Sequence, residues 1–183
     1  MAKLFSKAVL GGVSIGVGSI IYLRFPSPVG AAFFSAGLLM IMVLDFKLYT
    51  GVIGSARTDK DFAEAFIILL GNLLGCFVIM IEKSDKAKEI VEAKMAVQLH
   101  ITFIRACLCG GIIYSCVRAF QRSLYPLVIL FVAAFILSGA EHSIADFCYI
   151  ISAEKFGTQS TIFMLTVIIG NLVGAQLYSR TSV

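Results

Sequence analysis

The sequence predicts an all-α integral membrane protein in which six transmembrane helices form a single domain over residues 1–183. Two observations lead to this prediction. The chain is 59% hydrophobic and only 14% charged, with a mean hydropathy of +0.95, and a soluble domain of this length carries more charge. Apolar windows, each near the about 20 residues that a helix needs to cross the hydrocarbon core, lie at roughly 8–23, 29–54, 64–82, 97–117, 127–151 and 161–178.

The first window predicts an uninterrupted span, whereas the second predicts a broken one. The first follows Met1–Lys7, and because its apolar run is long and no clear small-x-small cleavage site follows it, an uncleaved first span is expected. The second is longer than one span requires, and Asp45, Lys47 and Thr50 stand beside glycines well inside it. This pattern predicts a second helix that is broken at depth, with freed backbone groups lining a cavity.

The third and sixth windows carry an internal echo. Leu70–Gly75 reads LGNLLG and Ile169–Gly174 reads IGNLVG, and each ends a set of three windows. Three spans per half place the halves in opposite orientations, so we expect two inverted repeats over about 1–83 and 94–180. A glycine face for close helix packing is the simpler interpretation of the same motif.

The fourth window holds His100, Thr102 and Arg105, which we interpret as interfacial or subunit-contact residues. Three of the five cysteines also fall there, and all five lie in apolar windows, where free thiols behave as small hydrophobic side chains. Cys107-x-Cys109 is not a convincing metal spacing, so no metal site and no cofactor are expected.

The fifth window is the second broken helix and contains Glu141, His142 and Asp146. Ionisable groups at such depth cost several kcal/mol unless they are partnered or wetted. We therefore expect them to handle protons, ions or a polar substrate. One alternative is a cation or metal transporter that uses Asp45 together with these three side chains as ligands.

Charge and motifs argue against two other classes of function, nucleic-acid binding and catalysis. The net charge is +4 with basic residues scattered through connectors, so nucleic acid is not an expected partner. The chain has neither a nucleophile–base–orienter set nor an H-E-x-x-H motif, so an enzyme is not expected. Seven short-loop Lys or Arg residues on one side against six on the other leave the orientation open.

Several ordered fragments resemble the formate/nitrite transporter family of anion channels over almost the whole chain. They are Phe34–Leu38 through Leu48–Gly51, the paired G-N-x-x-G motifs, Lys94-Met95 ahead of Arg105-Ala106, and Glu141-His-Ser-Ile-Ala145. The resemblance implies an aquaporin-like fold, a homopentamer with one pore per protomer, and cytoplasmic termini. It implies a protein of the lipid bilayer, in the inner (plasma) membrane, whose partners are small anions and protons.

The resemblance also assigns roles. It implies that His142 is the central pore histidine, with Thr50 as its partner in the broken second span. Lys94 becomes the cationic attractor of the vestibule, and Glu141 supports the neighbouring backbone. The implied hydrophobic constrictions are Phe34, Leu38, Leu48 and Phe135.

The expected mechanism follows from solvation. A small anion loses many kcal/mol of hydration in a narrow apolar passage, whereas its neutral acid does not. His142 can donate or relay the proton because its unperturbed pKa is about 6.5. Formate and nitrite are the leading candidates, followed by hydrosulfide, acetate and lactate, with poor passage of chloride.

The chain departs from the family pattern at Lys47, Gly110 and Asp146, where the family has glutamate, asparagine and asparagine. Lys47 is expected to compensate by pairing with Asp146, Asp45 or Glu141, so that Asp146 and Lys47 exchange charges relative to the family. The departures also leave open a non-conducting relative.

Overall fold

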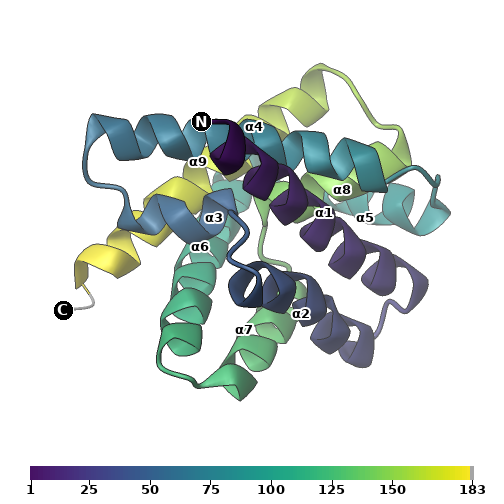
Figure 1. Cartoon of the computed structure of the whole chain (residues 1–183). Helices are drawn as coiled ribbons and strands as arrows, with labels where there is room; N and C mark the ends of the chain where they lie inside the picture. Colours follow the sequence, from purple (N-terminus) through teal and green to yellow (C-terminus); the bar gives the residue numbers. More distant parts are fainter. Residues whose placement is uncertain (182–183) are drawn as a thin grey trace.

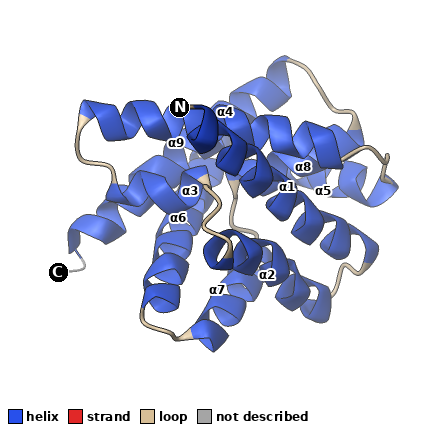
Figure 2. Ribbon diagram, in the orientation of Figure 1, coloured by secondary structure: helices blue, strands red, loops and turns tan. Residues whose placement is uncertain are grey.

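The structure is a computed structural model, and it describes residues 1–181. Every regular element in that range is helical, with no strand (Figure 2). The helices are α1 (Ala2–Arg24), α2 (Pro28–Val43), α3 (Tyr49–Val52), the 3₁₀ helix η1 (Ile53–Ser55), α4 (Asp59–Ile79), α5 (Asp85–Met95), α6 (Leu99–Gln121), α7 (Tyr125–Leu137), α8 (Ser143–Ala153) and α9 (Thr158–Thr181).

Four helices, α1, α4, α6 and α9, are long and apolar enough to cross a membrane. The second and fifth windows are both interrupted, as the sequence predicts: the second is divided into α2, α3 and η1, and the fifth into α7 and α8. In the second, Asp45 adopts a left-handed φ of 53° after α2, and in the fifth, Gly139 adopts a φ of 69° after α7. An α-helix cannot continue through such a residue, so these two positions end the first half of each broken span.

The long helices pack in two pairs, α1 on α4 and α6 on α9, and Figure 1 shows the remaining helices arranged around them. Each pair crosses at a glycine. A Cβ added to Gly12 would lie 2.0 Å from the Asn72 carbonyl oxygen, and one added to Gly110 would lie 2.2 Å from the Asn171 carbonyl oxygen. Backbones that approach this closely tolerate no side chain at the crossing.

One element was not expected from the sequence. The connector between the third and fourth windows folds into α5, whose N-terminus is capped by the Ser84 hydroxyl accepting from the Ala87 N–H at 3.2 Å. Ala87 and Val91, four residues apart, are buried on its inner face, and α5 packs against α8. The helix is short and mostly polar, so a search for apolar windows does not find it.

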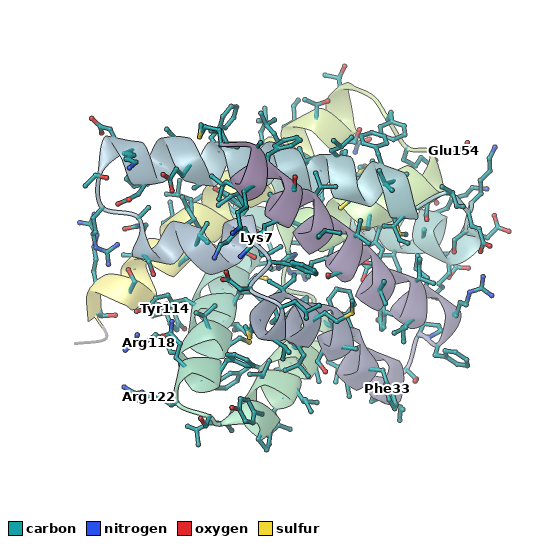
Figure 3. All side chains as sticks on the ribbon, viewed as in Figure 1. Lys7, Phe33, Tyr114, Arg118, Arg122 and Glu154 are labelled. Carbon is teal, nitrogen blue, oxygen red and sulfur yellow. The ribbon has the colours of Figure 1, made fainter. Side chains whose placement is uncertain are left out.

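The outer surface is strongly apolar. On α4, Phe66, Leu70, Leu74 and Phe77 form a stripe of exposed side chains, and Phe33 projects outward from α2 (Figure 3). Contiguous exposed apolar surface of this kind marks contact with lipid or with another subunit.

Candidate functional site

Asn72 holds the break in the second span. Its side-chain amide donates to the carbonyls of Ala8 and Lys47, at 2.7 and 2.8 Å, and its Oδ1 accepts from the Tyr49 N–H at 2.8 Å. Asn72 is fully buried on α4. It therefore satisfies the backbone groups that the break leaves free on either side of Leu48.

Asn171 does the same for the fifth span. Its amide donates to the carbonyls of Ala106 and Glu141, at 2.9 and 2.8 Å, and its Oδ1 accepts from the Ser143 N–H at 2.9 Å. The residue held between the last two groups is His142. The two asparagines make matching contacts, which place Leu48 and His142 at equivalent positions of the two breaks.

The two breaks meet through His142 and Thr50. His142 Nε2 lies 2.9 Å from Thr50 Oγ1, and both side chains are buried. This is the pair that the family resemblance implies for the centre of a pathway, and the structure brings it together. A polar pair of this kind offers hydrogen bonds in a region that is otherwise apolar.

The contact made by His142 Nδ1 determines which tautomer the neutral histidine adopts. His142 Nδ1 accepts a hydrogen bond from the Ala145 N–H at 3.1 Å and so caps the N-terminus of α8. Because Nδ1 is an acceptor here, the proton of the neutral ring is on Nε2, and Nε2–H donates to Thr50. The Thr50 hydroxyl then keeps its own proton for another acceptor.

Phe34 and Phe135 form an aromatic pair next to this histidine. Their ring centroids are 5.7 Å apart at 87°, and Phe135 also stacks on His142 at 5.7 Å. Leu38 lies one helical turn after Phe34 on α2, and Leu38 and Leu48 are both buried. These are the four residues that the sequence predicts as constrictions, and all four lie in the core.

Two cavities reach this region. The first, which we call the Lys94 cavity, has a volume of about 160 Å³, and the residues that line it include Lys94, Arg105, Phe135, Glu141, His142 and Asp146. The second, the Lys47 cavity, has a volume of about 410 Å³, and Leu38, Asp45, Lys47 and Leu48 are among the residues that line it. One cavity thus ends at His142 and the other at the two leucines.

Lys94 contacts two carboxylates at once. Its Nζ bonds to Glu141 Oε2 and lies 3.0 Å from Asp146 Oδ1. Burial would lower the pKa of Lys94, but the charges of Asp146 and Glu141 outweigh it and hold the pKa above its ordinary value. The second oxygens, Glu141 Oε1 and Asp146 Oδ2, are buried with no hydrogen-bond partner within the described part of the chain.

The expected exchange between Asp146 and Lys47 is wrong. Lys47 bonds to Asp45 Oδ1 at 2.6 Å, and Asp45 also pairs with Lys7. Asp146 turns to Lys94 instead, because it belongs to the other cavity. Of the three partners proposed for Lys47, the structure selects Asp45.

The same separation counts against the ligand set of a metal transporter. Asp45 lies in the Lys47 cavity, whereas the other three proposed ligands line the Lys94 cavity. Within residues 1–181, no group of three or more His, Cys, Asp or Glu side chains is placed to hold a metal ion.

Gly110, a departure from the family pattern, has a packing reason. Its Cα lies where α6 crosses α9, and a Cβ there would collide with the Asn171 backbone. An asparagine does not fit this crossing. The substitution therefore belongs to the helix contact and not to a cavity.

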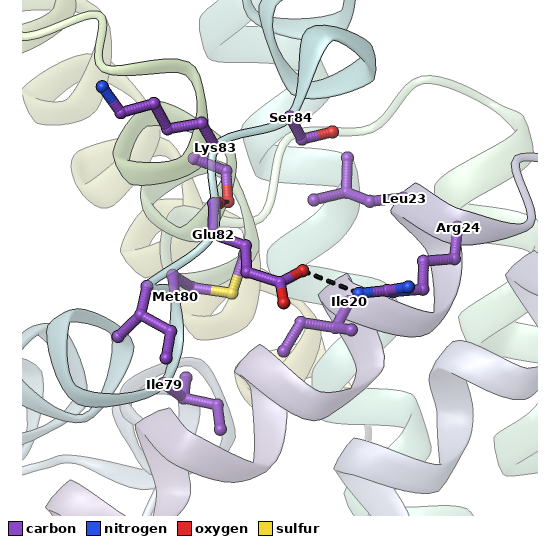
Figure 4. A pocket seen from close by; sticks show the side chains of 10 residues that line it. Ile20, Leu23, Arg24, Ile79, Met80, Glu82, Lys83 and Ser84 are labelled. Carbon is purple, nitrogen blue, oxygen red and sulfur yellow. Dashed lines mark hydrogen bonds and ion pairs between the residues drawn. The ribbon is translucent and has the colours of Figure 1, made fainter.

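A larger cavity, of about 510 Å³, lies elsewhere (Figure 4). It is lined by the end of α1 and the connector after α4, and an ion pair between Arg24 and Glu82, 2.6 Å long, crosses it. It contains none of the predicted site residues.

The role of the two asparagines as backbone clamps was not predicted from the sequence. The signal was present, since Asn72 and Asn171 are amides in otherwise apolar spans, and a buried amide needs three or four partners. The motif around them was interpreted only as a repeat and a packing face.

Comparisons with known proteins agree with this geometry. The family model described as "Formate/nitrite transporter" matches residues 1–181. The chain is similar to a solved structure described as a "Pentameric formate channel with formate bound", at 20% identity and a TM-score of 0.84, covering 97% of this chain and 93% of that one. A second, an "FNT family ion channel", has 21% identity and a TM-score of 0.75, covering 98% and 86%. No curated protein matches the chain. At these identities the structural likeness establishes the fold alone.

Proposed function

This chain belongs to the formate/nitrite transporter family, and we propose that it carries small monovalent weak-acid anions, formate and nitrite first, across a membrane through a pathway centred on His142. Hydrosulfide, acetate and lactate are further candidates. One of the structures that share the fold is described as a pentameric formate channel with formate bound, which supports formate as the first substrate to test and a homopentamer as the assembly.

The observation that carries the proposal is the buried His142–Thr50 pair beside the Phe34–Phe135 rings. We propose that the substrate passes from the Lys94 cavity, past the aromatic rings and this pair, to the Lys47 cavity. Leu38 and Leu48 form the second constriction. The protein then lies in the inner membrane with both termini in the cytoplasm. In this orientation, the Lys94 cavity opens to the outside of the cell.

The apolar rings select for the neutral form of the substrate. An unpaired carboxylate loses far more hydration free energy in an apolar slot than the corresponding acid does. A weak acid can pick up a proton on entry and release it beyond the rings, whereas chloride cannot at physiological pH. Proton-coupled movement of weak acids follows from this difference.

If His142 supplies the proton, its cap must loosen. The ring can give up a proton and remain neutral only if both nitrogens are protonated first. A proton on Nδ1 displaces the hydrogen bond from the Ala145 N–H that caps α8. Proton transfer through His142 is therefore coupled to a change in the first turn of α8. Without such transfer, Nε2–H and the Thr50 hydroxyl act as hydrogen-bond donors to the passing substrate.

Reconstitution tests the proposal. Purified protein in liposomes should accelerate uptake of formate and nitrite above protein-free liposomes, with little acceleration of chloride. Failure to accelerate any weak acid between about pH 5 and pH 8 would contradict it. A metal-dependent cation flux would support the cation transporter instead.

A further inference from the structure

We propose that Arg105, and not Lys94, is the side chain that binds the anion in the Lys94 cavity. The proposal rests on the proposed function and names the group that receives the substrate. It arises from an imbalance of charge in this cavity: its buried lysine already has two carboxylate partners.

The charge of Lys94 is fully occupied within the protein. Its side chain is 18% exposed, and its carboxylate partners, Glu141 and Asp146, are 0% and 2% exposed. Two carboxylates around one ammonium leave no positive charge for a third anion, and an approaching anion meets a site that is neutral or negative. Asp146 is a departure from the family pattern, so this neutralisation is a property of this chain.

Arg105 lines the same cavity, but in contrast to Lys94 its side chain has no carboxylate partner within residues 1–181. It projects from α6 and is half-buried, and its Nη1 lies 4.0 Å from the position of a Cβ added to Gly139, in the loop that precedes Glu141. The Arg105 carbonyl accepts from the Glu141 N–H at 3.4 Å, which ties α6 to that loop. Within residues 1–181, the guanidinium makes no hydrogen bond or ion pair.

A guanidinium without a partner in a cavity of about 160 Å³ fits a small planar anion. It presents N–H donors in a rigid fork, which bonds two oxygens of one anion at once. Formate and nitrite each present two oxygens on one atom, whereas chloride presents none. The cavity holds such an anion together with a few water molecules, at about 30 Å³ per water.

The other polar groups of the cavity do not compete for this role. Tyr22 on α1 and Tyr149 on α8 are neutral hydrogen-bonding side chains, and His142 is bonded to Thr50 and to the backbone. Arg105 is therefore the one charged side chain of the Lys94 cavity, within the described chain, whose charge is uncompensated.

Transport kinetics of two variants test the role. Arg105→Gln should raise the KM for formate about tenfold, since a hydrogen bond to a charged group is lost at a partly exposed site, with a much smaller change in the maximal rate. Arg105→Lys keeps the positive charge and loses the two-pronged donor geometry of the guanidinium, so its KM should lie between those of the wild type and Arg105→Gln. Arg24→Gln, at the end of α1 in the separate cavity of about 510 Å³, is the matched control and should leave the KM unchanged. Formate uptake by the wild type with an unchanged KM in Arg105→Gln would overturn the assignment and leave the proposed function standing.

A binding measurement tests the role of Arg105 in anion binding independently of transport. Formate should raise the melting temperature of the detergent-solubilised wild type and of Arg24→Gln, and this shift should be reduced in Arg105→Gln. Equal shifts in Arg105→Gln and wild type would overturn the assignment whether or not the protein transports. In an Asp146→Asn background, where Lys94 has only one ionised partner, the loss caused by Arg105→Gln should be smaller.

Discussion

His142 Nε2 lies 2.9 Å from Thr50 Oγ1, and this bond joins residues 92 positions apart, one from each broken span. Asn171 bonds to the backbone on both sides of His142, and Asn72 bonds to the backbone of Lys47 and Tyr49, immediately before Thr50, so the contact depends on both clamps. The centre of the proposed pathway is therefore set by buried polar groups in two long helices, α4 and α9.

Two substitutions of His142 distinguish its role as the N-cap of α8 from its role in proton transfer. Asparagine is a good N-cap residue and does not titrate, whereas alanine removes both functions, at a cost of about 1 kcal/mol for the lost cap. We expect His142→Asn to keep nearly wild-type thermal stability and His142→Ala to be less stable. Proton-coupled formate uptake should be lost in both. Wild-type uptake in His142→Asn would show that the ring proton is not used.

Asp146→Asn should preserve transport. It leaves Lys94 with Glu141 alone, so the Lys94 cavity becomes less negative, and the KM for formate should fall by about threefold at low ionic strength. The effect should shrink as salt is raised. A variant that folds but no longer transports would mean that Asp146 takes part in the passage itself.

Lys94→Met should be strongly destabilising. It leaves the buried Glu141 and Asp146 carboxylates without their cation, and breaking a buried pair in this way costs about 3–5 kcal/mol. Thermal unfolding in detergent provides the measurement. Adding Asp146→Asn to Lys94→Met should recover part of the loss, and equal stability of the single and double variants would argue against the paired carboxylates as the cause.

The two asparagine clamps should carry comparable stability. Asn72→Ala and Asn171→Ala each remove three buried hydrogen bonds, and we expect a loss of about 3 kcal/mol or more in each case. Asn171→Asp keeps the acceptor for the Ser143 N–H and loses the donors to Ala106 and Glu141. Unfolding temperatures near that of wild type for the alanine variants would contradict the clamp.

The crossing of α6 and α9 should reject any side chain at Gly110. Gly110→Ala places a methyl group 2.2 Å from the Asn171 carbonyl oxygen, so the helices must separate, and we expect a marked fall in stability. Gly157→Ala is the matched control, because nothing lies within 4 Å of a Cβ there. Similar behaviour of the two variants would show that the helices can move apart freely.

The sequence predicts the broken spans because these depend on local signals: glycines beside polar residues, and a motif repeated in both halves. The His142–Thr50 pair was implied by the family resemblance alone, since the two residues are 92 positions apart. The partners of Lys94 could not be found in the same way. Lys94 and Glu141 are 47 positions apart, and no periodicity connects a short polar helix to a loop of another span. The choice between Asp45 and Asp146 for Lys47 likewise depends on which cavity each carboxylate enters.

Arg105 illustrates the same limit. Its type and position within an apolar window marked it as unusual, and we interpreted it as an interfacial or subunit-contact residue. The structure places its guanidinium by Gly139, in a cavity shared with Glu141 and His142. That neighbourhood depends on where α6 meets the break in the fifth span.

Simultaneous measurement of labelled formate uptake and lumen pH in proteoliposomes tests the central claim most directly. We expect formate and protons to enter together, faster than in protein-free liposomes, and His142→Asn to remove this increment. Formate entry through the protein without acidification of the lumen would contradict proton coupling, and an uptake rate equal to that of protein-free liposomes would contradict the pathway itself.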